Sequence, residues 1–392
     1  MTIPLYKNHN APESLPQNSN TGLWFDKFCN KWCLDSQKSG LPAWSLEAFV
    51  EGHGKDRRDI NPKLDWIRTV AGKGVGDEKL LREYSNRIAA LARACGGEAF
   101  YFKTVSRFTT GLGREHPIEN GFVWHPALGA PFLPGSSVKG LVRSWAVTWL
   151  ETDADSVSRI FGPRDLPAVP PDIGGVIFFD AVPVAPVQLS ADVMTPHYGP
   201  YYEQGEAPGD WHSPAPIPFL TVSSGQSFLF PLAPRTLSDA DLADCRAAAG
   251  WLESALLELG AGAKTAAGYG RFERDTKKGA EAEKRRDDEE RNAQFAKLNP
   301  IAREFAEAAF SGKWFQDKNA FSQPGVIEGW LAKLETTPDK DAVCRLRDLV
   351  NHHFCGLLAN PDKTEGKKNA PVFKDRQRQF ARQLNALLNQ TP

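Results

Sequence analysis

The sequence predicts an α+β fold, because segments typical of strands and of helices alternate through the middle of the chain. Six such segments follow one another in the order strand, helix, strand, strand, helix, strand. They are Ala99–Phe108, Ser136–Leu150, Gly174–Val184, a hairpin from Ile217 to Ala233, Ser238–Leu259 and Tyr269–Glu273. This order is the split β-α-β arrangement of ferredoxin-like (RRM-like) folds, whose sheet commonly presents one face to RNA.

The strands are predicted from their composition. Ala99–Phe108 is rich in aromatic and β-branched residues, and Gly174–Val184 has the nearly continuous apolar character of a buried strand. Ile217–Ser223 and Gln226–Ala233 are separated by Ser224-Gly225, which favours a tight turn. We therefore expect these last two segments to pair with each other as a hairpin.

The two central helices are predicted from their caps and their apolar stripes. Ser136 or Ser137 is expected to cap the first helix, on which Lys139 and Arg143 share one face. The opposite, apolar face consists of Val138, Leu141, Val142, Trp145 and Trp149. Ser238 is expected to cap the second helix, with Asp241 at the third position of a capping box. Gly260 is expected to end it.

The composition divides the chain of 392 residues into four predicted segments. Residues 1–97 form a partly helical N-terminal region, with a helical pattern from Asp77 to Cys95, and residues 98–274 form the α+β core. Residues 275–294 form a charged linker, since 12 of the 15 residues from Lys277 to Arg291 are charged. Residues 295–392 form a helical C-terminal region.

Charge and cysteine content limit the classes of function. The chain has 47 basic and 48 acidic residues, so a nucleic-acid site requires its basic groups to be clustered. Six cysteines without a disulfide framework favour the cytoplasm, and no run of about 18 apolar residues predicts a membrane span. Cys29 and Cys33 lack a second pair of ligands, so neither a metal nor another cofactor is predicted.

The first candidate site is the segment Pro131–Arg143. The start of a helix offers free N–H groups and partial positive charge to an anion. Gly135 would let a phosphate approach the backbone, Ser136 and Ser137 would add hydroxyl donors, and Lys139 and Arg143 would extend the positive charge. The alternative is an ordinary capped amphipathic helix with solvated charges.

The second candidate site is the glycine-rich segment Gly260–Phe272. It is not a P-loop, because Ala263 precedes Lys264 and a helix precedes the loop instead of following it. A glycine-dense turn can lay backbone N–H groups against a sugar-phosphate chain. The residues predicted to do so are Gly262, Lys264, Thr265, Gly268, Tyr269 and Arg271. The alternative is a helix end followed by a tight turn.

A third candidate is the aromatic stretch Thr195–Glu203, inside the long segment Leu189–Pro218. His197, Tyr198 and Tyr201 offer rings on which bases can stack, each stack being worth about 1–3 kcal/mol. The alternative is that these rings pack the long loop against the domain.

Several of these motifs together resemble the RAMP superfamily of CRISPR proteins. The likeness rests on Pro131–Arg143, Phe178–Ala181, Asp192–Tyr202 and Gly260–Phe272. Arg107–Gly113, followed by Glu119-Asn-Gly121, makes the sequence most similar to the family of sixth subunits of the Cmr (type III-B) RNA-guided effector. The resemblance covers about residues 98–273 and leaves residues 295–392 without a counterpart.

The resemblance implies a RAMP ferredoxin-like core in a non-catalytic backbone or capping subunit used in antiviral defence. Such a subunit binds the 3′ region of the guide RNA, helps to recognise target RNA, and contacts backbone RAMP subunits and the small helical subunit. The segment Leu189–Pro218 would be the projecting thumb of this family. No membrane is implied.

Two other functions remain open from the residues. One is a metal-independent RAMP endoribonuclease that processes guide precursor, with His116 or His125 as the general base. The other is a scaffold that binds only protein. The leading hypothesis requires the two glycine-bearing turns to meet on one side of the folded chain.

Overall fold

The computed structural model describes residues 14–16, 19–35, 43–52, 57–163, 173–212, 214–365 and 370–390. They form two compact units, residues 1–280 and 281–392. The predicted N-terminal region and the predicted core both fall in the first unit.

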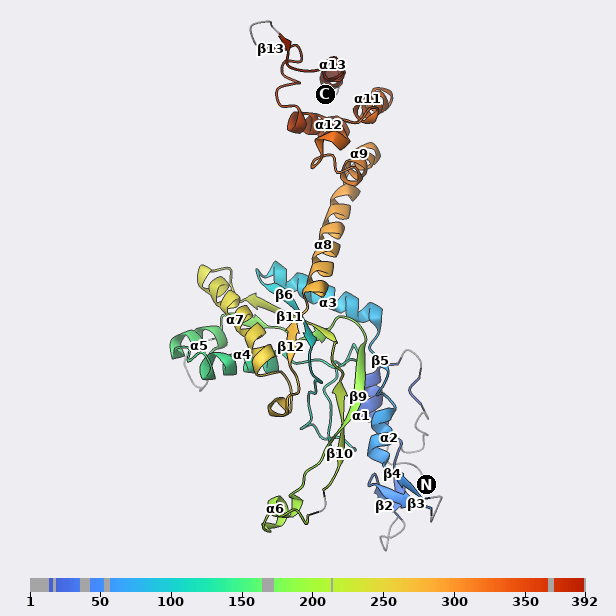
Figure 1. The fold of residues 1–392 in the computed structure, drawn as a ribbon, viewed down its shortest axis with the longest axis vertical. Coiled ribbons are helices and arrows are strands. Elements are labelled where there is room, and N and C mark those ends of the chain that lie inside the picture. The colour runs from blue at the N-terminus through green and yellow to red at the C-terminus, as the bar shows by residue number, and fades with distance from the viewer. Residues whose placement is uncertain are drawn as a thin grey trace. The chain divides into compact units, whose positions relative to one another are not determined.

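The first unit is built on an antiparallel five-stranded sheet (Figure 1). Its strands are β6 (Glu98–Thr104), β7 (Val176–Phe178), β8 (Val182–Pro183), β11 (Ser227–Pro234) and β12 (Phe272–Arg274). They lie in the order β12-β6-β11-β7, with β8 also paired to β11. One long helix, α4, connects β6 to β7 along the chain, and another, α7, connects β11 to β12.

Helices cover both faces of this sheet. They are α3 (Glu78–Ala94), α4 (Gly135–Thr148), α5 (Ala154–Phe161) and α7 (Asp239–Glu258). Phe102 of β6 faces one way and packs in a core with Val142 of α4 and Leu252 of α7. Its neighbour Tyr101 faces the other way and packs against the cluster around Leu81 of α3. The face opposite to α4 and α7 is therefore covered by α3.

A second sheet contains β5 (Gly74–Val75), β9 (Val187–Met194) and β10 (Ile217–Val222) in the order β10-β9-β5. The predicted pairing of Ile217–Ser223 with Gln226–Ala233 is wrong. β10 pairs with β9, from Ile217 opposite Met194 to Val222 opposite Leu189. The N–H groups of Gly225 and Gln226 instead donate to the backbone carbonyl and the hydroxyl of Thr104, so the chain passes from one sheet to the other.

The β9–β10 hairpin forms an arm that carries α6 (Gly199–Gln204) at its end (Figure 1). Towards the N-terminus the structure adds α1 (Thr21–Lys27), β1 (Cys33–Asp35), β2 (Ala43–Ser45), β3 (Phe49–Glu51), β4 (Arg58–Ile60) and α2 (Pro62–Arg68). Phe25 and Trp66 of this region are buried in the same core as the central sheet.

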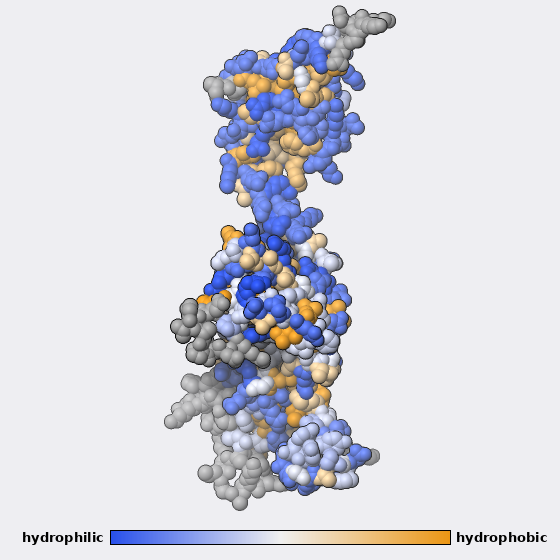
Figure 2. Space-filling model, turned by 90° about the vertical axis from the view of Figure 1, so that its left-hand side faces the viewer, coloured by the Kyte–Doolittle hydropathy of each residue, from blue (hydrophilic) through white to orange (hydrophobic). Residues whose placement is uncertain are grey.

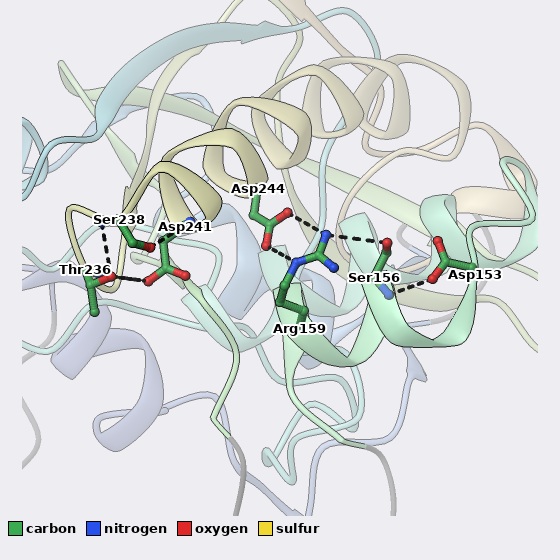
Figure 3. A network of polar contacts seen from close by, with 7 residues as sticks. All are labelled: Asp153, Ser156, Arg159, Thr236, Ser238, Asp241 and Asp244. Atoms are coloured by element: carbon green, nitrogen blue, oxygen red, sulfur yellow. Dashed lines mark hydrogen bonds and ion pairs between the residues drawn. The ribbon is translucent and has the colours of Figure 1, made fainter.

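The helix α7 begins as predicted, at a Ser238 side chain that accepts from the N–H of Asp241 at 3.2 Å. The capping box does not form, since the Asp241 carboxylate accepts from the N–H and the hydroxyl of Thr236 instead. Further along α7, the buried carboxylate of Asp244 holds α5 through two hydrogen bonds from Arg159, of 2.7 and 2.9 Å (Figure 3). A bidentate pair of this kind fixes orientation as well as distance.

The charged segment predicted at residues 275–294 lies in one helix, α8 (Thr276–Ala296). No described residue of α8 is buried, and Figure 2 shows its surface as hydrophilic. No helix among the described residues has both the length and the apolar character needed to span a membrane.

The second unit has its own apolar core, in which Phe305, Leu346 and Phe380 are buried. Its elements are α9 (Pro300–Ser311), α10 (Lys318–Phe321), α11 (Val326–Thr336), α12 (Lys340–His353), β13 (Thr364–Glu365), β14 (Ala370–Pro371) and α13 (Asp375–Gln390). Arg376 of α13 pairs with Glu328 of α11 and lowers the pKa of that carboxyl to about 2.

Candidate nucleic-acid interface

The two glycine-bearing turns of the sequence meet at one cavity of about 800 Å³. We call it the glycine cavity. The first turn and α4 line it with Leu133, Ser137, Leu141, Ser144 and Trp149. The second turn lines it with Glu258–Ala263, Thr265, Ala266 and Arg271, and the chain after β6 adds Thr110, Gly111, Leu112 and Gly113.

The start of α4 differs from the prediction. Its N-cap is Pro134, and neither Ser136 nor Ser137 accepts a capping hydrogen bond, so the predicted serine cap is wrong. The N–H of Gly135 donates to a carboxylate oxygen of Asp180 at 2.7 Å. A Cβ atom at Gly135 would lie 2.3 Å from the carbonyl oxygen of Phe178. Glycine is therefore required here by a neighbouring strand that passes close to the helix start.

Lys139 and Arg143 do not line the glycine cavity, whereas Ser137 does. Burial lowers the pKa of Lys139, and the charges of Arg143 and Arg235 lower it further. These three cations thus lie near one another, and none of them forms an ion pair with another described residue. Arg235 was not among the predicted site residues, because it lies nearly 100 positions from the α4 cations in the chain.

The second turn is pressed against the chain that follows β6. Gly262 has a φ of +84°, and a Cβ atom there would lie 2.2 Å from the Thr109 carbonyl oxygen. Gly270 has a φ of +75°, and its Cβ would lie 1.9 Å from the Ala261 carbonyl oxygen. Both positions require glycine for conformation and for space. The N–H of Ala263 completes the contact by donating to Thr109 at 2.8 Å.

Several backbone donors of this turn remain free. Among the described residues, the N–H groups of Gly262, Lys264, Thr265 and Ala266 have no hydrogen-bond acceptor. Gly262, Thr265 and Ala266 also line the glycine cavity. Successive backbone N–H groups of this kind form a concavity suited to an anion.

Tyr269 and Lys264 anchor the turn to the arm and do not line the cavity. The Tyr269 hydroxyl donates to Asp192 of β9 at 2.7 Å, and Arg107 donates to the same oxygen at 2.5 Å. Burial, and then the Asp192 carboxylate, raise the pKa of Tyr269 to about 12. The Lys264 ammonium lies 5.5 Å from the ring centroid of Phe219 in β10.

Arg271 is the cation of the glycine cavity. Its N–H donates to the hydroxyl of Ser106 at 3.0 Å, and its guanidinium donates to the carbonyl of Leu257 at 3.3 Å. It forms no ion pair with another described residue. Gly268, in contrast, has a φ of +90° with open space beside it, outside the cavity lining.

The predicted stacking rings lie on the arm and do not join the glycine cavity. His197, Tyr198 and Tyr201 are all exposed, the last two by 38% and 45%. The alternative that these rings pack the segment against the domain is therefore wrong for the three predicted residues.

The two histidines considered as catalytic bases are held inside the fold. Nε2 of His116 contacts the carbonyl of Phe25 at 3.0 Å, while Nδ1 accepts from the N–H of Ile118. Nδ1 of His125 accepts from the N–H of Leu128, and its ring packs against Tyr84. Burial lowers the pKa of both histidines.

Sequence reasoning missed Trp149 and the Thr-Gly-Leu-Gly segment at 110–113. Trp149 was assigned to the apolar face of α4, whereas it is 61% exposed and lines the cavity. Trp149 follows the last helical residue, Thr148. This position at the helix end was the signal in the sequence that its ring could lie outside the core. In the sequence, Gly111 and Gly113 contribute only to the family likeness.

Comparison with known proteins identifies the family of the chain. Residues 101–273 match the model of the RAMP superfamily. The CRISPR system Cmr subunit Cmr6 of Pyrococcus furiosus is 31% identical over 254 residues, which are 50% of this chain and 72% of that protein. The Cmr6 subunit of Saccharolobus solfataricus is 33% identical over 125 residues, which are 31% of this chain and 39% of that protein.

Two solved structures also align with the chain. The crystal structure of Cmr6 from Pyrococcus furiosus matches with 30% identity and a TM-score of 0.31, covering 45% of this chain and 97% of that one. A chain from the cryo-EM structure of the type III-B Cmr-β complex bound to cognate target RNA matches with 22% identity and a TM-score of 0.44, covering 54% and 70%.

Residues 101–273 thus form a RAMP superfamily domain. The chain belongs to the Cmr6 family of CRISPR-system subunits, because it is 31% identical to the Pyrococcus protein over 72% of that protein's length.

Proposed function

We propose that this chain is a non-catalytic backbone or capping subunit of a type III-B (Cmr) effector complex. It binds the 3′ region of the guide RNA and helps to recognise target RNA in antiviral defence, in the cytoplasm. Its partners are the guide and target RNA, the backbone RAMP subunits and the small helical subunit. Membership of the Cmr6 family supports this assignment.

One observation carries the RNA-binding part of the proposal. The glycine cavity joins Ser137 of the first turn to Gly262, Thr265 and Arg271 of the second, although more than 120 residues separate them in the chain. Free N–H groups, and a guanidinium that forms no ion pair with another described residue, suit the oxygen atoms of a ribose-phosphate strand. Lys264, Gly268 and Tyr269 lie outside the cavity lining and would support this second wall by shaping and anchoring the turn.

Lys139 and Arg143, with Arg235, form a second cationic surface. We assign it to further phosphates of the same RNA, because like charges held together without a counter-ion favour an anion. Gly135 and Ser136 would then lie along the path between this surface and the glycine cavity.

The fold supports the finer architecture that the proposal needs. The sheet order β12-β6-β11-β7, with its two connecting helices, fits a ferredoxin-like RAMP core. The β9–β10 arm, with His197, Tyr198 and Tyr201 exposed near its end, would be the thumb that separates bases or meets the next subunit. The segments 275–294 and 295–392 would be a linker and an added helical region.

The environment of the histidines supports a non-catalytic role. Both ring nitrogens of His116 already have partners in the protein, and His125 is 9% exposed. A general base must reach the proton that it removes. We therefore do not carry forward the endoribonuclease alternative.

The test is a salt titration of RNA affinity with the full chain in its guide-bearing complex. Replacing Arg271→Ala should weaken binding and reduce the slope of log K against log salt by about one, because one fewer counter-ion is released. The double variant Lys139→Ala with Arg143→Ala should reduce it by about two. Arg246→Ala, on the exposed part of α7, is the matched control. Unchanged affinity and slope in both variants would contradict the proposal.

A further inference from the structure

We propose that the stacked rings of Trp145 and Trp149 form a platform for one nucleobase of single-stranded RNA at the glycine cavity. This inference rests on the proposed function and adds a base contact to a site so far argued only from phosphate chemistry.

The geometry of the platform is set by α4. Trp145 and Trp149 are four residues apart, so their side chains lie one above the other on the same side of the helix. Their ring centroids are 5.7 Å apart and the ring planes differ by 14°. Trp145 is half-buried and Trp149 is 61% exposed. Trp145 thus stacks against the Trp149 ring, most of whose surface remains exposed.

The position of Trp149 is unusual for so large an apolar ring. Exposed apolar side chains are ordinary when they stand singly, but Val147 and Leu150 beside it are exposed as well, by 46% and 45%. Three large apolar side chains are thus exposed within four residues of the chain at the end of α4. Of the three, Trp149 is the one that lines the glycine cavity.

The chemistry of the cavity selects RNA as the occupant. The same cavity is lined by Thr265 and Ala266, whose N–H groups are free, and by Arg271, whose guanidinium forms no ion pair with another described residue. Glu258 also lines the cavity, and its negative charge would keep the phosphates of an RNA strand at a distance. A flat ring next to anion-binding donors combines the two features of single-strand binding, which are stacking and phosphate contacts.

The test separates bases from phosphates with two fluorescent probes. One is an oligouridylate of about 12 nucleotides, a length within the range of single-strand sites, and the other is an abasic ribose-phosphate chain of equal length. Binding of each to the full chain is measured by fluorescence anisotropy at several salt concentrations. The variants are Trp149→Ala, Trp149→Phe, and Leu150→Ala as a control that removes a neighbouring exposed side chain outside the cavity lining.

The platform predicts a specific pattern. Trp149→Ala should weaken binding of oligouridylate between about fivefold and a hundredfold, the loss of one stack. It should leave the abasic affinity and the salt slope unchanged. Trp149→Phe should restore most of the affinity, and Leu150→Ala should bind like the wild type.

Other results overturn the platform. Equal losses for both probes in Trp149→Ala would mean that the ring supports the fold instead of a base, and no loss for either would remove its role altogether. If the wild type bound neither probe, the proposed function would fail and the platform with it. If the wild type bound both equally, with a steep salt slope, phosphate binding would stand and the platform alone would fall.

Discussion

The two glycine-bearing turns are each held by one aspartate, but at different atoms. Asp180 accepts from the backbone N–H of Gly135, at the start of α4. Asp192 accepts from the side-chain hydroxyl of Tyr269, beyond the second turn. The first aspartate therefore uses a backbone donor that an anion would need, whereas the second anchors its turn and leaves the N–H groups around Thr265 free.

This difference limits what a glycine-rich segment predicts. Both turns need glycine because another stretch of backbone passes within contact distance of the missing Cβ. Glycine is required where the protein backbone packs closely against itself, and it is equally required where a phosphate comes close to the backbone. Only the acceptor found by each N–H group tells the two apart.

The largest expected effect comes from enlarging the glycines. Gly270→Ala should lower the free energy of unfolding by about 3 kcal/mol or more, because it combines a positive φ with a clash against Ala261. Gly135→Ala should cost about 2 kcal/mol from its clash with Phe178 alone. Urea unfolding of the full chain, followed by tryptophan fluorescence, measures both.

Gly268→Ala is the matched control for these variants. Its φ is also positive, at +90°, but the space beside it is open. It should cost only about 1 kcal/mol, the conformational part. If Gly268→Ala destabilised the chain as much as Gly270→Ala, close packing would not be what distinguishes the turn.

A smaller effect is expected from removing the first anchor. Asp180→Ala should lower the free energy of unfolding by about 1 kcal/mol, the usual cost of a lost acceptor at a helix start. It should leave RNA affinity unchanged or slightly higher, because a carboxylate is removed near α4. Urea unfolding and an RNA titration check the two parts. A marked loss of RNA affinity in a stable variant would contradict this, because Asp180 would then contribute to RNA binding.

The smallest effect is a pH dependence at the second anchor. Burial raises the pKa of Asp192, but hydrogen bonds from Tyr269 and Arg107 outweigh it and hold the pKa below its ordinary value of 3.8. The folded state thus favours the charged carboxylate, and this stabilisation is present above pH 3.8 and lost as the pH falls through the folded pKa.

Unfolding measured between about pH 5 and pH 3 should therefore show a steeper loss of stability for the wild type than for Asp192→Asn, by about 1 kcal/mol or less. Identical pH profiles would show that Asp192 does not anchor the second turn through its charge.

Local signals predicted much of the first unit. The Ser238 cap and the stop at Gly260, which has a φ of +79°, bound α7 as expected. The helical pattern from Asp77 to Cys95 is α3, which Asp77 caps. Each of these features depends on atoms within about one helical turn, so the sequence contains all the participants.

Pairings between distant segments were predicted less well. The Ser224-Gly225 turn had the composition of a hairpin, yet its donors bind Thr104, more than 100 residues away. Trp149 had the spacing of a core residue, yet it lies past the end of α4. In both cases the local pattern allowed two outcomes, and contacts from elsewhere in the chain selected one.

The sequence by itself determined the two glycine-bearing turns, the helix limits at Ser238 and Gly260, and the family likeness. Tertiary structure alone decided that Ser137 and Arg271 line one cavity, that α3 covers the open face of the sheet, and which N–H groups stay free. The physical reason is range: caps and turns are settled over a few residues, whereas the partner of each donor depends on how the whole unit packs.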